Sequence, residues 1–193
     1  MRLRGRISAG TVYAITRRPS TDKPTVIPTA KLTHRATATL KPTPIPAGFV
    51  LVIDTREQQP LFTGKAYVAA LPVEHRAIET GDYTIAGYEG RVAIERKKMS
   101  DLYAYLGKER RKTRPKLEKL GAMDWAALII EASEADLARQ YKYSKKLTPE
   151  HVRGFLTSVR VRYGIHVYMS SVRSALERYV LDSLVKWYEL HKE

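Results

Sequence analysis

Two carboxylates and one lysine stand at a spacing that suits hydrolysis of a phosphodiester bond. Asp82 follows a glycine, and thirteen positions later an apolar run ends in Glu95-Arg96-Lys97. An apolar run that ends in ionised side chains is typical of a buried strand that delivers a polar site at its end. Carboxylate oxygens are ligands that Mg2+ (or Mn2+) prefers, and such a metal can hold a scissile phosphate and lower the pKa of a bound water. We therefore expect metal-assisted cleavage chemistry at these residues.

Two further acids follow apolar runs and are expected at the same edge of the sheet. Asp54 comes directly after the run at residues 49–53, and Glu131 comes directly after the run at residues 125–130. Carboxylates from neighbouring strands can share one cation. For Glu131 the sequence leaves three roles open: a metal ligand, a support of the site, or an ordinary surface acid.

The alternation of side chains along a strand predicts how the residues beside Glu95 are arranged. Lys97 lies two positions beyond Glu95, so both side chains point to one face of the strand. The Lys97 ammonium could orient the attacking water or offset charge on the phosphate in the transition state. Arg96 points to the opposite face, where Asp54 or Glu57 is its expected partner.

The acids, the lysine and their neighbours together match the signature of one nuclease family. The chain has Gly-Asp at 81–82, Glu-Arg-Lys at 95–97 and Asp101 four positions past the lysine. Upstream, an apolar run ends in Asp54-Thr55-Arg56-Glu57. This order resembles the nuclease domain of the XPF family of structure-specific endonucleases, which includes archaeal Hef and belongs to the PD-(D/E)xK superfamily. The resemblance covers about residues 49–190.

The resemblance implies a role for each matching residue. It implies metal ligation by Asp54, Asp82 and Glu95, and a catalytic centre made of Asp82, Glu95 and Lys97. It implies that five further residues support the active site: Arg56, Glu57, Arg96, Asp101 and Glu131. Asp101 would either cap a helix or contact the metal ligands without binding the metal itself. The implied reaction is hydrolytic nicking of DNA at a branch, flap or fork, in DNA repair, recombination or phage DNA metabolism.

The charge of the chain points to a polyanionic partner, most simply DNA. The formal net charge is +14, which favours binding to nucleic acid. The basic segment at residues 108–119 could contact phosphates or be a solvated helix face. Four tyrosines that interleave with basic residues could stack on frayed bases or pack inside the fold; they are Tyr103, Tyr105, Tyr141 and Tyr143. The residues expected to bind DNA are Lys98, Lys108, Arg110, Arg111, Lys112 and Arg114.

The sequence divides into an arm and a domain. Residues 1–48 hold nine Lys/Arg and one acid and are rich in Pro, Thr and Ala. Prolines at this density favour an extended, irregular backbone, so we expect a basic arm over residues 1–48 and a nuclease domain over residues 49–193. The arm is either a flexible tail or a DNA-contacting segment. No segment resembles the tandem helix-hairpin-helix module that follows the nuclease domain in many family members. The resemblance therefore implies neither selectivity for branched DNA nor the family's way of dimerising. A homodimer formed through the nuclease domain is one possible assembly.

Strands alternate with helices in the domain, which predicts an α/β fold. Apolar runs predict strands near 49–53, 91–97, 125–130 and 165–168, an extended stretch spans 75–85, and Gly87 and Gly90 bracket a hairpin turn. Residues 67–71 could form a strand or part of a helix. Helix-start residues predict one helix capped by Ser100 or Asp101, a second after Thr148 with Pro149, and a last one capped by Ser171. The expected fold is a restriction-endonuclease-like three-layer sandwich around a central mixed sheet.

Composition excludes several other classes of protein. The chain has no cysteine, which rules out disulfides and thiolate zinc sites and fits a reducing compartment. The longest apolar runs are far shorter than a membrane span, and the basic amino end lacks the apolar segment of a secretory signal. We therefore expect no membrane association, and a location in the cytoplasm of a bacterium or phage-infected cell, or in the nucleus of a eukaryote.

Two alternatives to an active nuclease remain. A catalytically silent DNA-binding partner of the same fold would share the charge, but the intact set of Asp82, Glu95 and Lys97 argues against it. A basic RNA- or ribosome-associated protein would explain the charge but not the acids at three strand ends.

Overall fold

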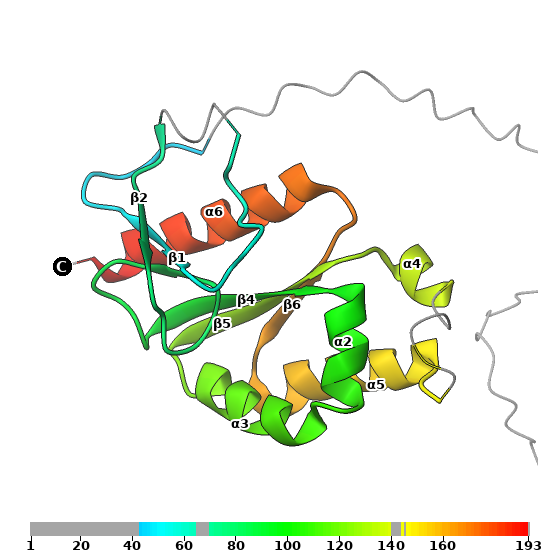
Figure 1. Ribbon diagram of the computed structural model, residues 1–193. Helices are drawn as coiled ribbons and strands as arrows, with labels where there is room; N and C mark the ends of the chain where they lie inside the picture. The colour runs from blue at the N-terminus through cyan, green and yellow to red at the C-terminus, as the bar shows by residue number, and fades with distance from the viewer. Residues whose placement is uncertain (1–42, 65–69, 140–143, 145, 193) are drawn as a thin grey trace, which may run out of the picture. The chain divides into compact units, whose positions relative to one another are not determined.

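The computed structural model describes residues 43–64, 70–139, 144 and 146–192 (Figure 1). Most of the expected arm, residues 1–42, lies outside these ranges, so the division into an arm and a domain stays a prediction. Most of the segment 67–71 and two of the tyrosines considered for base stacking, Tyr141 and Tyr143, also lie outside the described residues.

One sheet with helices on both faces forms the described part of the chain. Its strands are β1 (Leu51–Asp54), β2 (Val73–Arg76), β3 (Tyr83–Ile85), β4 (Val92–Lys98), β5 (Trp125–Glu131) and β6 (His166–Met169). The helices are α2 (Met99–Leu106), α3 (Arg110–Gly121), α4 (Glu134–Ala138), α5 (Pro149–Tyr163) and α6 (Arg173–His191).

The sheet is mixed, as predicted, with the order β2-β1-β3-β4-β5-β6. β1 runs parallel to β2 and antiparallel to β3, β3 is antiparallel to β4, and β4, β5 and β6 are parallel to one another. The turn between β3 and β4 contains Gly87 and Gly90, both at positive φ (82° and 86°), which confirms the predicted hairpin. β3 and β4 are therefore central, with strands on both sides of each.

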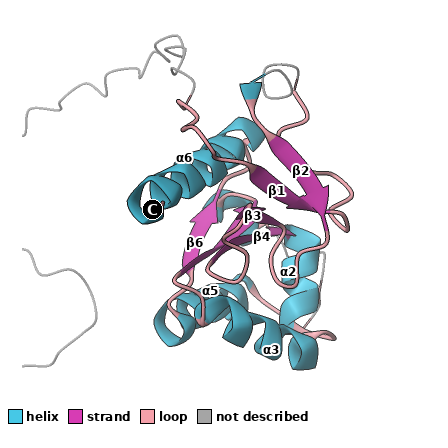
Figure 2. Cartoon of the chain, turned by 90° about the vertical axis from the view of Figure 1, so that its left-hand side faces the viewer, coloured by secondary structure: helices cyan, strands magenta, loops and turns pink. Residues whose placement is uncertain are grey.

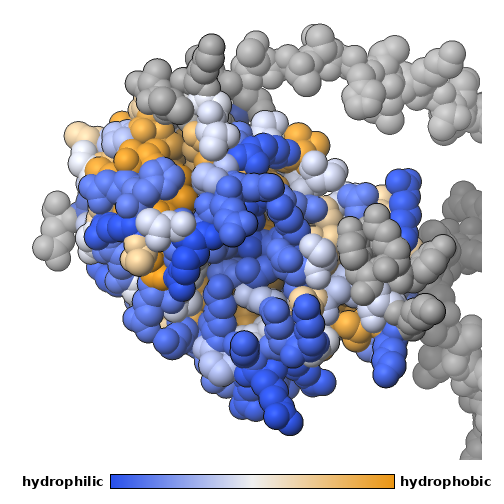
Figure 3. Space-filling view, viewed as in Figure 1, coloured by the Kyte–Doolittle hydropathy of each residue, from blue (hydrophilic) through white to orange (hydrophobic). Residues whose placement is uncertain are grey.

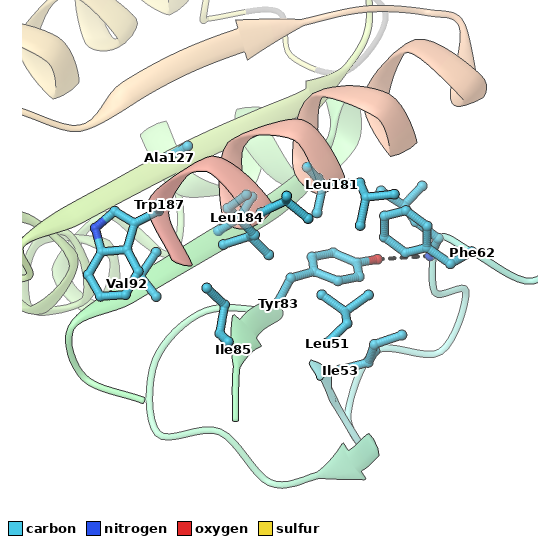
Figure 4. Close-up of a cluster of buried hydrophobic side chains, with 14 of the residues drawn as sticks. Leu51, Ile53, Phe62, Tyr83, Ile85, Val92, Ala127, Leu181, Leu184 and Trp187 are labelled. Atoms are coloured by element: carbon cyan, nitrogen blue, oxygen red, sulfur yellow. Dashed lines mark hydrogen bonds between the residues drawn. The ribbon is translucent and has the colours of Figure 1, made fainter. Parts of the chain in front are cut away.

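Two hydrophobic cores lie on opposite faces of the sheet. Figures 1 and 2 show α6 on one side of the sheet and α2, α3 and α5 on the other. The core under α6 contains Tyr83, whose hydroxyl accepts a hydrogen bond from the Leu61 N–H (2.9 Å). Figure 4 shows Tyr83 among Leu51, Leu181 and Leu184 of that core. This arrangement is the expected three-layer sandwich.

The ends of two helices differ from the prediction. α2 begins at Met99 with Lys98 as its N-cap, so neither Ser100 nor Asp101 caps it, because β4 continues to Lys98 and leads into the helix without a loop. α6 begins at Arg173 with Val172 as its N-cap, one residue later than predicted. α5 begins as predicted, because the Thr148 side chain and Pro149 supply the start signals.

The residues just before β1 already contact the folded part of the chain. The Tyr188 hydroxyl of α6 donates a hydrogen bond to the carbonyl of Ala47 (3.2 Å), and Ile45 packs against the core under α6. Residues 45–47, which were expected in the arm, therefore belong to the packed structure. None of the helices in the described ranges has the length and apolar character needed to cross a bilayer.

Candidate active site

Backbone pairing brings three predicted site residues together. The Asp82 N–H donates to the Ile94 carbonyl (2.9 Å), and the Asp54 N–H donates to the Asp82 carbonyl (3.0 Å). Along β4, Ile94 belongs to the core under α6 and Ala93 to the core under α2, α3 and α5. Because side chains alternate along a strand, Glu95 points toward the layer of α2, α3 and α5. The predicted alternation of side chains along β4 is thus confirmed.

The glycine before Asp82 allows this segment to approach β4 closely. Gly81 has a φ of +99°, and a Cβ atom built on it would lie 2.8 Å from the Cβ of Ala93. A side chain here would meet both a disfavoured backbone conformation and a steric clash. The Gly-Asp pair is therefore a requirement of packing as well as of chemistry.

Asp82 is a carboxyl group in an environment that disfavours its charge. Its Oδ2 accepts a hydrogen bond from the Arg96 N–H (2.6 Å). Burial raises the pKa of Asp82 to about 7, and the nearby charge of Glu95 adds to the rise. Asp82 is therefore more easily protonated than an ordinary aspartic acid.

Glu95 is the most enclosed acid of the site, with 1% of its surface exposed. Its Oε1 accepts hydrogen bonds from the Tyr105 hydroxyl (2.9 Å) and the Lys116 ammonium (2.7 Å) and pairs with Lys97. Its Oε2 is buried and has no hydrogen-bond partner among the described residues. Burial acts to raise the pKa of Glu95, but the ammonium groups of Lys97 and Lys116 outweigh it, so the net shift in pKa is downward. Glu95 is therefore an ionised carboxylate with one oxygen left to bind.

Lys97 is held in its charged form. Burial acts to lower the pKa of Lys97, but the charges of Glu95 and Asp82 outweigh burial and raise it. Its Nζ also lies 4.8 Å from the centre of the Tyr105 ring, a cation–π contact. Lys97 is thus an ammonium at neutral pH, which suits stabilisation of negative charge and not proton abstraction.

Two of the residues around Glu95 were not predicted as site residues. Lys116 reaches Glu95 from α3, where buried Thr113, Leu117 and Leu120 define the inner face of the helix. The helical spacing from Thr113 places Lys116 beside that face, a signal that the sequence contained but that the general basic character of the segment obscured. Tyr105 was considered for base stacking or packing; it is buried and donates to Glu95, which excludes base stacking.

Asp54 is bound to an arginine from its own strand end. Arg56 donates to Asp54 from its backbone N–H (2.7 Å) and from its guanidinium (Nε to Oδ1, 3.0 Å). The side-chain hydrogen bond from Arg56 lowers the pKa of Asp54. Within the described ranges, no group of three or more acidic, histidine or cysteine side chains is arranged to hold a metal ion. Metal ligation by Asp54, Asp82 and Glu95 therefore stays a prediction, and in this arrangement Asp54 faces Arg56.

The opposite face of β4 carries a supporting network. The guanidinium of Arg96, with only 4% of its side chain exposed, pairs with Glu57 (3.0 Å) and Glu131 (2.5 Å). It also donates to the carbonyl of Gln59 (3.0 Å). Of the two partners predicted for Arg96, Glu57 forms the pair, and Asp54 pairs with Arg56 instead. The Glu131 side chain lies on the opposite face of the sheet from Glu95. Its position fits a residue that supports the ends of β4 and β5, and not one that binds a metal together with Glu95.

Two hollows adjoin Asp82 and Arg56. One, of about 430 Å³, is also lined by Glu57, Lys97, Lys98 and Asp101. The other, of about 410 Å³, is lined by Asp54 and by Lys116 and Lys119 of α3. A polyanion that crosses the site from one hollow to the other would pass Arg56 and Asp82 and meet basic side chains in both.

The expected DNA-binding residues lie mostly on one exposed basic segment. Lys108, Arg110, Arg111, Lys112 and Arg114 are exposed at the start of α3 and just before it. Of these, only Arg114 forms an ion pair within the described residues, with Glu118 (2.9 Å). Lys98 lies apart from them and donates to Gln59 (2.7 Å). Figure 3 shows hydrophilic side chains over this part of the surface.

The donor set of the site suits a hard divalent cation. A cation held by Asp82 and Glu95 would bind Glu95 Oε2, which has no hydrogen-bond partner among the described residues, and would offset the burial and the Glu95 charge that raise the pKa of Asp82. Mg2+ commonly keeps several waters and needs only one or two protein carboxylates beside substrate phosphates. The residues present therefore fit such an ion.

A mixed sheet between helical layers, with acids and a lysine at the ends of its central strands, is a restriction-endonuclease-like fold. The ERCC4 domain profile matches residues 53–182, which is more than half of the chain. The chain therefore belongs to the ERCC4 domain family. None of the curated proteins matches it.

Solved structures with the same fold include two of XPF from Aeropyrum pernix. The structure of this XPF in complex with DNA matches with a TM-score of 0.57 and 17% identity, over 73% of this chain and 65% of that one. A second XPF structure from the same organism matches with a TM-score of 0.55 and 18% identity, over 71% and 65%. The chain thus covers just under two thirds of the XPF chains, and the similarity is one of fold.

Proposed function

We propose that this protein is a divalent-metal-dependent DNA endonuclease that acts on branched, flap or fork DNA. The observation that carries the proposal is Glu95, a buried, ionised carboxylate whose Oε2 has no hydrogen-bond partner in the described part of the chain. Beside it stand Asp82 and the Lys97 ammonium. Membership of the ERCC4 domain family and the DNA complex of Aeropyrum pernix XPF support DNA as the substrate.

In this proposal, Asp82 and Glu95 would hold Mg2+ or Mn2+. When bound, the metal would supply Lewis-acid activation of water and stabilise charge on the phosphate. Tyr105 and Lys116 fix one oxygen of Glu95, which leaves the other for the metal. Lys97 keeps its ammonium close to the reacting phosphate and offsets the charge that develops there.

Arg56 determines whether Asp54 joins the metal site. The Arg56 side chain is 69% exposed, while the Asp54 side chain beneath it is 2% exposed. An incoming phosphate offers the Arg56 guanidinium a second anionic partner at the surface. If Arg56 turns to that phosphate, Asp54 is released as the third carboxylate that the family resemblance implies.

A catalytically silent DNA-binding protein of the same fold is the alternative. It is favoured by the Arg56–Asp54 pair, which occupies one of the three expected ligands. This alternative keeps the basic α3 surface and its salt-sensitive phosphate contacts but predicts no cleavage.

Cleavage of a panel of DNAs distinguishes the two functions. Flap, fork and duplex substrates are incubated with wild-type protein in Mg2+, Mn2+ or EDTA. Glu95→Gln, which keeps the shape of the side chain, should reduce cleavage at least about a hundredfold while leaving DNA binding intact. The control is Glu189→Gln, an exposed acid on α6 that pairs only with Lys186 (3.2 Å) among the described residues and should cleave normally. If the wild-type protein cuts none of the substrates with either metal, the enzyme proposal is wrong and binding alone supports the silent alternative.

A further inference from the structure

A third hollow, of about 420 Å³, lies between α3 and α5 and is not lined by the acids of the candidate active site. Its lining comes from α2, α3, α5 and Leu147, and none of the acidic residues discussed above takes part. Its volume lies in the range of pockets that hold small ligands. Neither the fold nor the proposed cleavage chemistry requires such a hollow.

The lining combines flat apolar side chains with two arginines that have no ion-pair partner in the described part of the chain. Phe155 and Tyr163 of α5 face it, both partly buried, together with Leu117 of α3. Two exposed cations also border it, Arg110 from α3 and Arg162 from α5, and neither forms an ion pair with any other described residue. An aromatic surface beside free guanidinium groups matches a ligand that has both a flat ring and an anion.

An unpaired nucleotide of a nucleic-acid strand has that chemistry. Its base can stack on an aromatic side chain, and its phosphates can bind arginine. A base within a duplex has both faces stacked and cannot enter a hollow of this kind. Charge complementarity with a chain of net charge +14 favours a nucleic acid over a peptide as the occupant.

The basic surface continues beyond the hollow. An adjoining hollow of about 570 Å³ is formed by Gly107, Lys108, Arg110, Arg111 and Arg114. Arg110 and Arg114 line both hollows, so neighbouring phosphates of one strand would find cations along the start of α3. A single strand could therefore run along α3 with one base in the hollow between α3 and α5.

We propose that the hollow between α3 and α5 binds an unpaired base of single-stranded DNA, with Phe155 as the stacking surface and Arg110 and Arg162 as phosphate contacts. Tyr105 connects it to the acids, because its ring lines the hollow and its hydroxyl donates to Glu95. A strand seated there lies one side chain away from the candidate active site. This binding site goes beyond the proposed cleavage, since it requires neither a metal nor an intact Glu95.

The test measures binding of the full chain in EDTA by fluorescence anisotropy at physiological salt. The probes are labelled oligothymidine and an abasic oligonucleotide of the same length. Wild-type protein should prefer oligothymidine, and Phe155→Leu, which keeps an apolar side chain, should reduce that preference about fivefold or more, the lower end for stacking of one base. Abasic DNA should bind both proteins equally.

Two arginines on one helix supply the matched control. Arg162 and Arg160 are both exposed on α5 and both lack an ion pair among the described residues, but only Arg162 lines the hollow. Arg162→Glu should weaken oligothymidine binding about fivefold or more and Arg160→Glu less than about twofold, because only Arg162 lines the hollow and salt weakens the effect of a charge that makes no direct contact. Thermal unfolding of each variant reports whether it is folded.

Several outcomes would overturn the site. Equal affinity of the wild type for oligothymidine and abasic DNA excludes base stacking, and equal effects of the two arginine changes exclude a local phosphate contact. A clear preference for oligouridine over oligothymidine would assign the hollow to RNA. If an apolar anionic peptide displaced the probe and unlabelled oligothymidine did not, the hollow would be assigned to a protein partner. Because no metal is present, these results are independent of cleavage: a protein that fails to cut DNA can still show this site, and a nuclease can lack it.

Discussion

Asp82 should make the folded protein less stable as the pH rises, and its replacement by asparagine should reverse this loss. Burial and the charge of Glu95 raise the pKa of Asp82 from 3.8 to about 7 in the folded protein. In the unfolded chain the same carboxyl group titrates near its ordinary value. The asparagine of Asp82→Asn would be neutral at every pH, and its side-chain oxygen can still accept the hydrogen bond that the Arg96 N–H donates.

The sign and the size of the effect follow from proton linkage. Between about pH 4 and pH 7 the folded state holds more protons than the unfolded state, so the free energy of unfolding falls as the pH rises and levels off above pH 7. A pKa rise from 3.8 to about 7, at 1.36 kcal/mol per pKa unit, gives a total loss of at most about 4 kcal/mol. About 2 kcal/mol of it falls between pH 5 and pH 7.

Urea unfolding at pH 5, 6, 7 and 8 in EDTA measures this loss. The stability of Asp82→Asn relative to wild type should grow by about 2 kcal/mol between pH 5 and pH 7. Asp54→Asn is the control: because Arg56 lowers the pKa of Asp54, its carboxylate stays ionised from pH 5 to pH 8, and the substitution should destabilise the fold by the same amount at each pH. Added Mg2+ should stabilise the wild type at pH 8 and not Asp82→Asn, since only the wild type keeps both carboxylates.

A constant difference between wild type and Asp82→Asn from pH 5 to pH 8 would refute the reasoning. It would mean that Asp82 titrates at its ordinary pKa, and therefore that neither burial nor Glu95 acts on it in the folded state.

Three further substitutions test the site. Gly81→Ala should lower the free energy of unfolding in urea by about 2–4 kcal/mol, because Gly81 has a φ of +99° and a Cβ atom there would clash at 2.8 Å. Gly154→Ala should raise it by about 1 kcal/mol, because Gly154 lies in α5 with no atom within 4 Å of an added Cβ. Equal effects of the two changes would contradict this reasoning. Tyr105→Phe should cost about 2 kcal/mol in the same assay, the value of a hydrogen bond to a charged group; an unchanged midpoint would show that the hydroxyl contributes nothing. Lys116→Met should reduce cleavage by about 10–100-fold, whereas Lys186→Met, a change on exposed α6 where the lysine pairs with Glu189, should not. Tighter Mg2+ binding by Lys116→Met would instead mean that Lys116 competes with the metal.

The sequence predicted those parts of the fold that depend on local patterns. The apolar run before Glu95 predicted a buried strand, and the alternation of side chains correctly placed Glu95 and Lys97 on one face and Arg96 on the other. Thr148 and Pro149 predicted the start of α5, which the structure places at Pro149 with Thr148 as its N-cap. In each case the signal and the structure that it forms lie within a few residues of each other.

Partners from distant elements were predicted less well. Lys116 meets Glu95 across 21 positions of the chain, and only the packing of α3 on the sheet brings them together. Arg56 lies two positions from Asp54, yet nothing in the spacing indicates that it turns back onto that carboxylate. The cap of α2 was misplaced for a related reason: the end of β4 is set by its seven-residue pairing with β5, which the sequence of β4 alone does not contain.

The alternating faces of β4 limit how this protein can change over evolution. Inserting one residue within the strand would turn Glu95 and Lys97 toward the core under α6 and send Arg96 to the other side, so the site and one core would be lost in a single step. The turn at Gly87 and Gly90 tolerates such an insertion, because a Cβ atom on either glycine would have open space around it. Lineages of this domain should therefore differ in the length of that turn while the distance from Val92 to Lys97 stays fixed.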